Sequence, residues 1–155
     1  MSKNNRVLSI KEFDMSSIDF NRKCIVIGKT GVGKSELIRD LLYHQKNTIP
    51  VGQVISSTEF ASPFYGLFIP KIVIQGEYST NKVKDVIKRQ RKLVKKYGEK
   101  DPRASSFLVL DDCLHDARAW VKDKSMKDIF FNARHYALLF ILAMQYPLGI
   151  TPDLR

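Results

Sequence analysis

The sequence lacks the long apolar runs that mark membrane-spanning and secreted proteins. Its longest apolar run, from Ala137 to Met144, has eight residues, whereas a membrane-spanning helix needs about 18. The polar start, Met1 to Arg6, is not followed by an apolar core long enough for a signal peptide. We therefore expect neither a membrane span nor a secretion signal.

Cysteine is scarce as well, with Cys24 and Cys113 in or beside apolar segments of the 155-residue chain. Two cysteines in or beside predicted buried strands, without metal-ligand spacing, favour neither a disulfide framework nor a zinc site. A content of 44% hydrophobic and 27% charged residues is that of an ordinary globular protein, and the length fits one domain. We expect a single domain over residues 1–155 in a reduced, intracellular environment.

Acidic residues are few: 16 against 26 Lys and Arg, for a net charge of +10. From Lys82 to Lys100 nine basic residues accompany two acidic ones, so this segment carries seven of the ten excess charges. Such clustering favours a polyanionic partner, here a nucleic acid. A solvated helix face is the structural alternative.

One motif is complete. Residues 28–35 read GKTGVGKS and match the phosphate-binding pattern G-x-x-x-x-G-K-[ST]. An apolar segment before it, Cys24–Ile27, and a helical pattern after it, Glu36–Leu42, provide the strand, loop and helix that the motif requires. Glycines let backbone N–H groups approach a phosphate, Lys34 can reach the β- and γ-phosphates, and Ser35 can ligate Mg²⁺. The residues predicted to bind a nucleoside triphosphate are Gly28, Lys29, Thr30, Gly31, Val32, Gly33, Lys34 and Ser35.

A pair of carboxylates forms the second half of the predicted site. Asp111 and Asp112 directly follow the apolar segment Phe107–Leu110. In P-loop enzymes a carboxylate in this position holds Mg²⁺ together with the loop serine, and a second acid can orient or deprotonate the attacking water. We assign Asp111 to the metal and Asp112 to catalysis. The alternative, a polar turn at a strand end, is weaker because α/β sheets bind ligands at the carboxyl ends of their strands.

Gln145 ends a later apolar segment, Leu138–Met144. If this strand lies between the loop strand and the Asp-Asp strand, the amide lies beside the γ-phosphate. A strand-end polar residue before a proline turn is the alternative.

Apolar segments alternate with helical patterns, which predicts a mostly parallel sheet flanked by helices. The lysine-rich helix can be capped by Ser79, Thr80 or Asn81 and ends at Gly98. The face opposite its apolar residues carries Lys84, Lys88, Arg91, Lys92 and Lys95. A short strand and turn are expected within residues 7–21, and an aromatic-rich loop over 61–70. The other predicted strands are 23–27, 51–55, 71–75, 107–110 and 138–144, and the other predicted helices are 34–44 and 124–134.

These motifs, together with Thr58-Glu59, Pro63-Phe64-Tyr65 and the segment FFNARHYALLFILAMQYPLGITPDLR, resemble the genome-packaging ATPases of large nucleocytoplasmic DNA viruses. That family is the poxvirus-type branch of the FtsK–HerA P-loop superfamily. The resemblance covers nearly the whole chain and is most specific from Asn132 to Arg155. It implies an additional-strand, RecA-like P-loop NTPase domain with strand order 5-1-4-3-2.

The resemblance also implies an activity. The protein would bind ATP and Mg²⁺, hydrolyse the ATP, and move double-stranded viral DNA into a capsid as a homo-oligomeric ring. Capsid or portal components would be further partners, and the host cytoplasm at the site of virus assembly, or the virion, would be its location.

The family's site residues correspond to residues of this chain. Lys34 and Ser35 take the Walker A roles, and Asp111 takes the Mg²⁺ role. Asp112 takes the catalytic acidic position and Gln145 that of the strand-four sensor. Arg134 or Arg155 resembles the arginine that acts on a neighbour's ATP, and we favour Arg134.

Two departures from the family pattern bear on function. Most related motors have Asp-Glu where this chain has Asp111-Asp112, so Glu59 is an alternative catalytic base. Family members also continue into a fifth core strand, whereas this chain stops at Arg155. We therefore expect a domain without its last strand, either as a fragment or as a natural shorter form.

Two other function classes remain open. One is a small P-loop kinase, whose lid the segment 82–100 could form. The other is a truncated, non-hydrolysing nucleotide- or DNA-binding module. Structural roles are expected for three histidines and for the aromatic residues outside the core strands: His44, His115, His135, Trp120, Phe60, Phe64, Tyr65 and Phe68.

Overall fold

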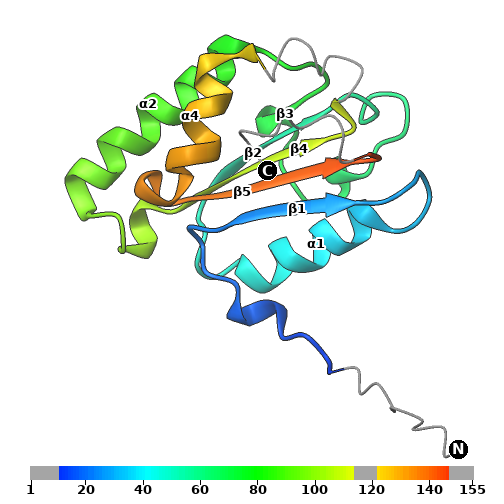
Figure 1. Ribbon diagram of the computed structural model, residues 1–155, viewed down its shortest axis with the longest axis horizontal. Helices are drawn as coiled ribbons and strands as arrows, with labels where there is room; N and C mark the ends of the chain where they lie inside the picture. The colour runs from blue at the N-terminus through cyan, green and yellow to red at the C-terminus, as the bar shows by residue number, and fades with distance from the viewer. Residues whose placement is uncertain (1–10, 114–121, 147–155) are drawn as a thin grey trace, which may run out of the picture.

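A computed structural model describes residues 11–113 and 122–146. Five parallel strands form one sheet in the order β1-β5-β4-β2-β3, and helices cover both of its faces (Figure 1). The strands are β1 (Lys23–Ile27), β2 (Gly52–Ser56), β3 (Ile74–Gln75), β4 (Ser106–Asp111) and β5 (Leu138–Met144). The α-helices in the described residues are α1 (Lys34–Gln45), α2 (Thr80–Tyr97) and α4 (Lys124–Asn132).

The inner strand β5, which lies between β1 and β4, shows how the helices are layered on the sheet. All seven residues of β5 are buried, as expected of a strand with helices on both faces. On one face Leu138, Phe140 and Leu142 belong to the core formed with α2 and α4. On the other, Leu139 and Ile141 pack in the core that includes residues of α1. Figure 1 shows α2 and α4 on one side of the sheet and α1 on the other.

The predicted insertion of a strand between the loop strand and the Asp-Asp strand is confirmed. β5 pairs with β1 on one side and with β4 on the other. In the numbering that the resemblance implies, β1, β5, β4 and β2 are strands 1, 4, 3 and 2 of the order 5-1-4-3-2. Among the described residues no strand pairs with the outer edge of β1.

Several predicted boundaries were wrong by a few residues. The strand expected over 71–75 is only Ile74–Gln75, because Lys71–Val73 form a 3-10 turn, η3, directly after Pro70. The strand predicted at 51–55 is 52–56, and the helix predicted to reach 134 ends at Asn132. A second 3-10 turn, η6 (Ala133–Tyr136), follows and leads to Ala137, whose φ of 48° turns the chain into β5.

Other single-turn 3-10 segments connect the main elements. The lead-in, expected to contain a short strand, has a turn at Met15–Ser17 (η1) in its described part. Two more lie at Tyr65–Leu67 (η2) and Pro102–Ala104 (η4). In the described parts of the chain, no helix is both long enough and apolar enough to cross a membrane.

Buried polar contacts fix α2 to the rest of the domain. Gln90 is fully buried, and its Nε2 donates to the carbonyl oxygens of Ala104 at 2.7 Å and Tyr136 at 2.9 Å. The amide therefore ties α2 to buried backbone oxygens of both η4 and η6, as buried carbonyl groups are usually hydrogen-bonded.

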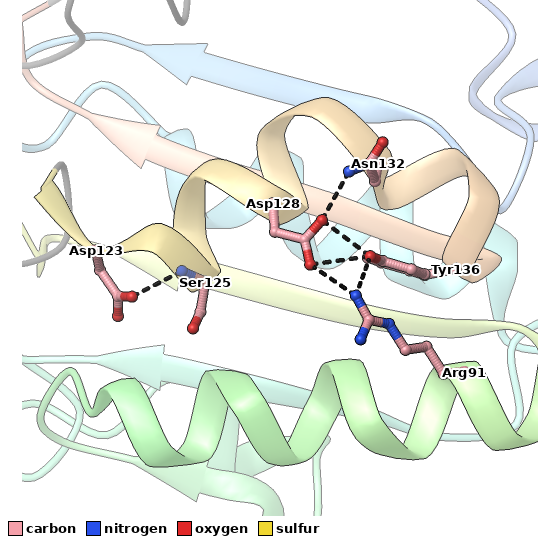
Figure 2. A network of polar contacts seen from close by, with 6 residues as sticks. All are labelled: Arg91, Asp123, Ser125, Asp128, Asn132 and Tyr136. Carbon is pink, nitrogen blue, oxygen red and sulfur yellow. Dashed lines mark hydrogen bonds and ion pairs between the residues drawn. The ribbon is translucent and has the colours of Figure 1, made fainter.

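Figure 2 shows a second connection, between α2 and α4. Arg91 donates to Asp128 at 3.2 Å and to the Tyr136 hydroxyl at 3.0 Å. Asp128 also accepts from Asn132 and from the Tyr136 hydroxyl. Arg91 lies on the exposed basic face, as predicted, with a side chain that is 62% exposed. Its guanidinium is nevertheless paired within the domain.

The described histidines lie at the surface. His44 Nε2 is 3.7 Å from Asp40, and His135 Nδ1 is 3.2 Å from Glu99. His115, Trp120 and Arg155 lie outside the described residues, so the expectations for them are not tested.

Candidate functional site

The predicted nucleotide-site residues meet at one edge of the sheet. The strands are parallel, so the loop after β1, Asp112 after β4 and Gln145 after β5 all follow carboxyl ends. The Gly28 N–H donates to the Met144 carbonyl at 3.1 Å, which extends the pairing of β1 with β5 into the phosphate loop. The loop therefore begins directly beside Gln145.

The glycines of the loop take conformations and spaces that other residues would not fit. Gly31 and Gly33 have φ angles of 80° and 92°, which are strained for residues with a Cβ. A Cβ on Gly28 would lie 2.7 Å from the Val32 side chain. Gly33 is the N-cap of α1, and no side chain caps this helix. The first N–H groups of α1 are thus available for an anion.

Lys34 opens α1 and is largely buried. Its exposed fraction is 8%, and its Nζ donates to the Lys29 carbonyl at 3.0 Å. The ammonium group therefore lies over the same loop whose backbone is suited to hold phosphates.

Ser35 and Asp111 come together as predicted. The Ser35 hydroxyl donates to Asp111 Oδ2 at 2.9 Å, and Asp111 is only 3% exposed. No group of three or more His, Cys, Asp or Glu side chains in residues 11–113 and 122–146 could hold a metal ion. One hydroxyl and one carboxylate instead fit Mg²⁺ that is bound jointly by the protein and by nucleotide phosphates.

Tyr65 belongs to this group, although its sequence context predicted only packing. Its hydroxyl donates to the same Asp111 oxygen at 2.8 Å, and the side chain is 1% exposed. Burial, followed by the negative charge of Asp111, raises the pKa of Tyr65 above its usual range, so the hydroxyl keeps its proton. Nothing local in the sequence distinguishes this tyrosine from the aromatic residues around it.

Asp112 has an unusual backbone conformation. Its φ is 52°, in the left-handed region, which asparagine and aspartate tolerate better than most residues. Its carbonyl accepts from the Ser57 hydroxyl at 2.6 Å, and its Oδ1 lies 3.4 Å from Gln145 Nε2. The two predicted catalytic side chains are therefore neighbours.

The carboxylate of Glu59, the alternative base, is hydrogen-bonded to the backbone of a nearby turn. It is 6% exposed and accepts backbone N–H bonds from Phe64 at 3.1 Å, Tyr65 at 2.9 Å and Gly66 at 2.7 Å. These three bonds hold the turn that carries Tyr65. The geometry thus favours a structural role for Glu59.

Arg134 lies apart from this group. It belongs to η6, at the amino end of β5, and its Nε donates to His135 at 3.1 Å. The seven residues of β5, at about 3.3 Å each, separate this edge from the phosphate loop by roughly 20 Å. Arg134 instead lines a surface pocket of about 500 Å³ that also includes Arg22, Lys23 and Phe131.

Comparison with known proteins finds viral relatives. No family model matches the chain. It is similar to uncharacterized proteins of Acanthamoeba polyphaga mimivirus (36% identical over 94% of the chain), Invertebrate iridescent virus 6 (40% over 95%) and Frog virus 3 (36% over 94%). It spans 53%, 59% and 48% of those proteins, about half their length.

Among solved structures, the pCW3 conjugation coupling protein TcpA, in its monomer form with ATPγS, is similar at a TM-score of 0.56. The match covers 88% of this chain and 47% of TcpA at 16% identity, so it shows a shared fold. Together with the loop and the inserted strand, this likeness shows that the chain has the α/β fold of P-loop NTPases.

The role of Glu59 can be tested by stability. Glu59→Gln replaces one acceptor oxygen with an NH₂ group and removes the charge that strengthens all three bonds. We expect the free energy of unfolding, measured by urea titration, to fall by about 2–3 kcal/mol. Glu77→Gln, at an exposed position, is the matched control and should change it by less than about 0.5 kcal/mol. A Glu59→Gln protein as stable as the parent but unable to hydrolyse ATP would make Glu59 the base.

Proposed function

We propose that this chain is an ATPase domain whose hydrolysis of ATP drives the movement of double-stranded DNA during viral genome packaging. One observation carries the proposal: Ser35, Asp111 and the Asp112–Gln145 pair lie together at the edge of the sheet where the phosphate loop begins. The viral origin of the relatives and the ATPγS in the TcpA structure support it.

Each residue has a distinct part in the proposed reaction. The loop N–H groups and the start of α1 bind the phosphates, and Lys34 neutralises charge on the β- and γ-phosphates. Ser35 and Asp111 would hold Mg²⁺, which, when bound with ATP, spreads the developing charge of phosphoryl transfer. Asp112 accepts a proton from the attacking water, and Gln145 orients that water or Asp112.

The phosphate loop and the base are tested together by ATP hydrolysis. Lys34→Ala should lower turnover by about 100- to 1000-fold, because it removes a preorganised positive charge. Asp112→Asn keeps the shape but cannot take a proton, so it should slow hydrolysis by about 100-fold or more while ATPγS still binds. Turnover is measured by phosphate release, with and without double-stranded DNA.

Lys46→Ala is the control, because Lys46 is exposed at the far end of α1, and it should leave turnover unchanged. Retention of more than a tenth of the parent's turnover by Lys34→Ala would refute the assignment of the loop. Parent protein that binds ATPγS but never hydrolyses ATP would refute the motor in favour of a binding module.

The DNA surface is proposed on α2. Lys84, Lys88, Lys92 and Lys95 are exposed along one side of this helix, and none is paired with an acidic side chain within residues 11–113 and 122–146 in the way that Arg91 is paired with Asp128. Evenly spaced, unpaired ammonium groups suit the phosphate backbone without reading its sequence.

Replacing these four lysines with glutamine should remove up to four phosphate contacts. The slope of log affinity against log salt should then fall by up to about 3.6 for double-stranded DNA, measured by fluorescence anisotropy. The control replaces Lys46 and Lys71, exposed residues outside α2, and should leave the slope within error. An unchanged slope in the four-lysine variant would show that this face of α2 is only solvated.

Arg134 is proposed to act on the ATP of a neighbouring subunit in a ring. It is exposed at the edge opposite its own phosphate loop, so it can reach only another subunit's phosphates. An arginine supplied from a neighbour is worth about 10³–10⁵ in turnover in comparable enzymes.

Mixing inactive chains tests this arrangement. Arg134→Ala chains keep an intact loop, and Lys34→Ala chains keep an intact arginine, so mixed oligomers should recover part of the hydrolysis that neither protein shows alone. Arg22→Ala, at the same edge, is the control, and it should hydrolyse ATP at the parent's rate without any mixing. Mixed oligomers, verified by size and composition, that stay inactive would overturn the role of Arg134.

A further inference from the structure

One side chain of the turn after β2, Tyr65, contacts Asp111, the proposed Mg²⁺ ligand. Glu59 holds the backbone N–H groups of residues 64–66, and this fixes the start of η2, where Tyr65 lies. The Tyr65 ring packs in the core on the α1 side of the sheet, with Phe64 and Phe68 edge-on or tilted at 5.2 and 5.9 Å. The position of Tyr65 is therefore set by ring packing and by the Glu59 hydrogen bonds, independently of its hydroxyl.

The hydroxyl ends at Asp111. Asp111 Oδ2 accepts two hydrogen bonds, from Tyr65 at 2.8 Å and from Ser35 at 2.9 Å. Oδ1 accepts none from the described residues, and no described Lys, Arg or His forms an ion pair with this carboxylate. Two neutral donors on one oxygen fix the rotation of the carboxyl group and leave the other oxygen free.

A buried carboxylate without a cationic partner is costly unless it is hydrogen-bonded. The two hydroxyls reduce that cost without cancelling the charge, so Asp111 keeps its attraction for a cation. The Ser35 hydroxyl is expected to turn toward Mg²⁺ when nucleotide is bound, whereas the Tyr65 hydroxyl lies outside the phosphate loop and can keep its bond throughout.

We propose that Tyr65 is a positioning residue for the Mg²⁺–nucleotide site: its hydroxyl bonds Asp111 Oδ2 and fixes the orientation of the carboxylate that would hold the cation. The inference rests on the proposed function of this edge as an ATP site. It differs from ordinary core packing because the ring supplies the packing and only the hydroxyl acts on Asp111. Outer partners of this kind typically change metal affinity by about 10- to 100-fold.

Tyr65→Phe separates the two roles, since it keeps the ring and removes only the hydroxyl. Binding of ATPγS is titrated by calorimetry at increasing Mg²⁺ and, separately, in EDTA. We expect the Mg²⁺ concentration for half-maximal enhancement of binding to rise about 10-fold, with metal-free binding unchanged. Tyr43→Phe, an exposed tyrosine of α1 that is 61% accessible, is the matched control and should match the parent in both titrations.

A Tyr65→Phe protein that is less stable but has the parent's Mg²⁺ requirement would make Tyr65 a core residue and overturn the proposal. If Tyr65→Phe does not fold, Glu59→Gln takes its place, because loosening the turn that carries Tyr65 should raise the Mg²⁺ requirement in the same direction. An unchanged requirement there would also overturn it. Parent protein that fails to bind ATPγS at all would instead refute the proposed function.

Discussion

The parallel pairing of β1, β5 and β4 is the constraint on which the candidate site depends. Ile27 lies opposite Met144, and Asp111 lies opposite Ala143, so the three strands end at almost the same level. The faces of β5 are covered by helices, which leaves only apolar positions along it. Polar chemistry is therefore confined to the strand ends, where the phosphate loop, Asp112 and Gln145 meet.

Within that edge, the buried charge of Asp111 organises the surrounding loops. A carboxylate that is 3% exposed needs hydrogen-bond donors, and it takes them from two segments far apart in the chain, at Ser35 and Tyr65. The phosphate loop, β4 and the turn after β2 are consequently joined at one oxygen atom. Glu59, in the turn that carries Tyr65, is a second buried carboxylate whose hydrogen-bond donors come from the protein. It accepts bonds from three backbone N–H groups.

The long helix α2 divides its polar residues between architecture and surface. Gln90 and Arg91 form bonds that tie the helix to η4, η6 and α4, while Val83 and Val86 fill the core. The lysines on its outer side, Lys84, Lys88, Lys92 and Lys95, form no ion pair with an acidic side chain of the described residues. A net charge read along the sequence cannot make this distinction, because a paired arginine and a solvated lysine count equally. Removing Arg91 would thus break its contacts with Asp128 and Tyr136 as well as remove a positive charge from the surface.

The sequence by itself determined the features whose signals are local. The phosphate loop, the Asp-Asp pair at a strand end, the parallel α/β class and the amphipathic helix at 80–97 were predictable because spacing and apolar periodicity encode them. Only the tertiary structure decided which residues meet. It shortened the strand at 71–75, paired Arg91 with Asp128, assigned the Glu59 carboxylate to a turn and brought the Tyr65 hydroxyl to Asp111. The contacts of Arg91 and Tyr65 join residues 37 and 46 positions apart, so their geometry is set by packing and leaves no pattern in the chain. The strand boundary and the Glu59 turn involve residues closer in sequence, but which of the possible local conformations forms is decided by the surrounding packing.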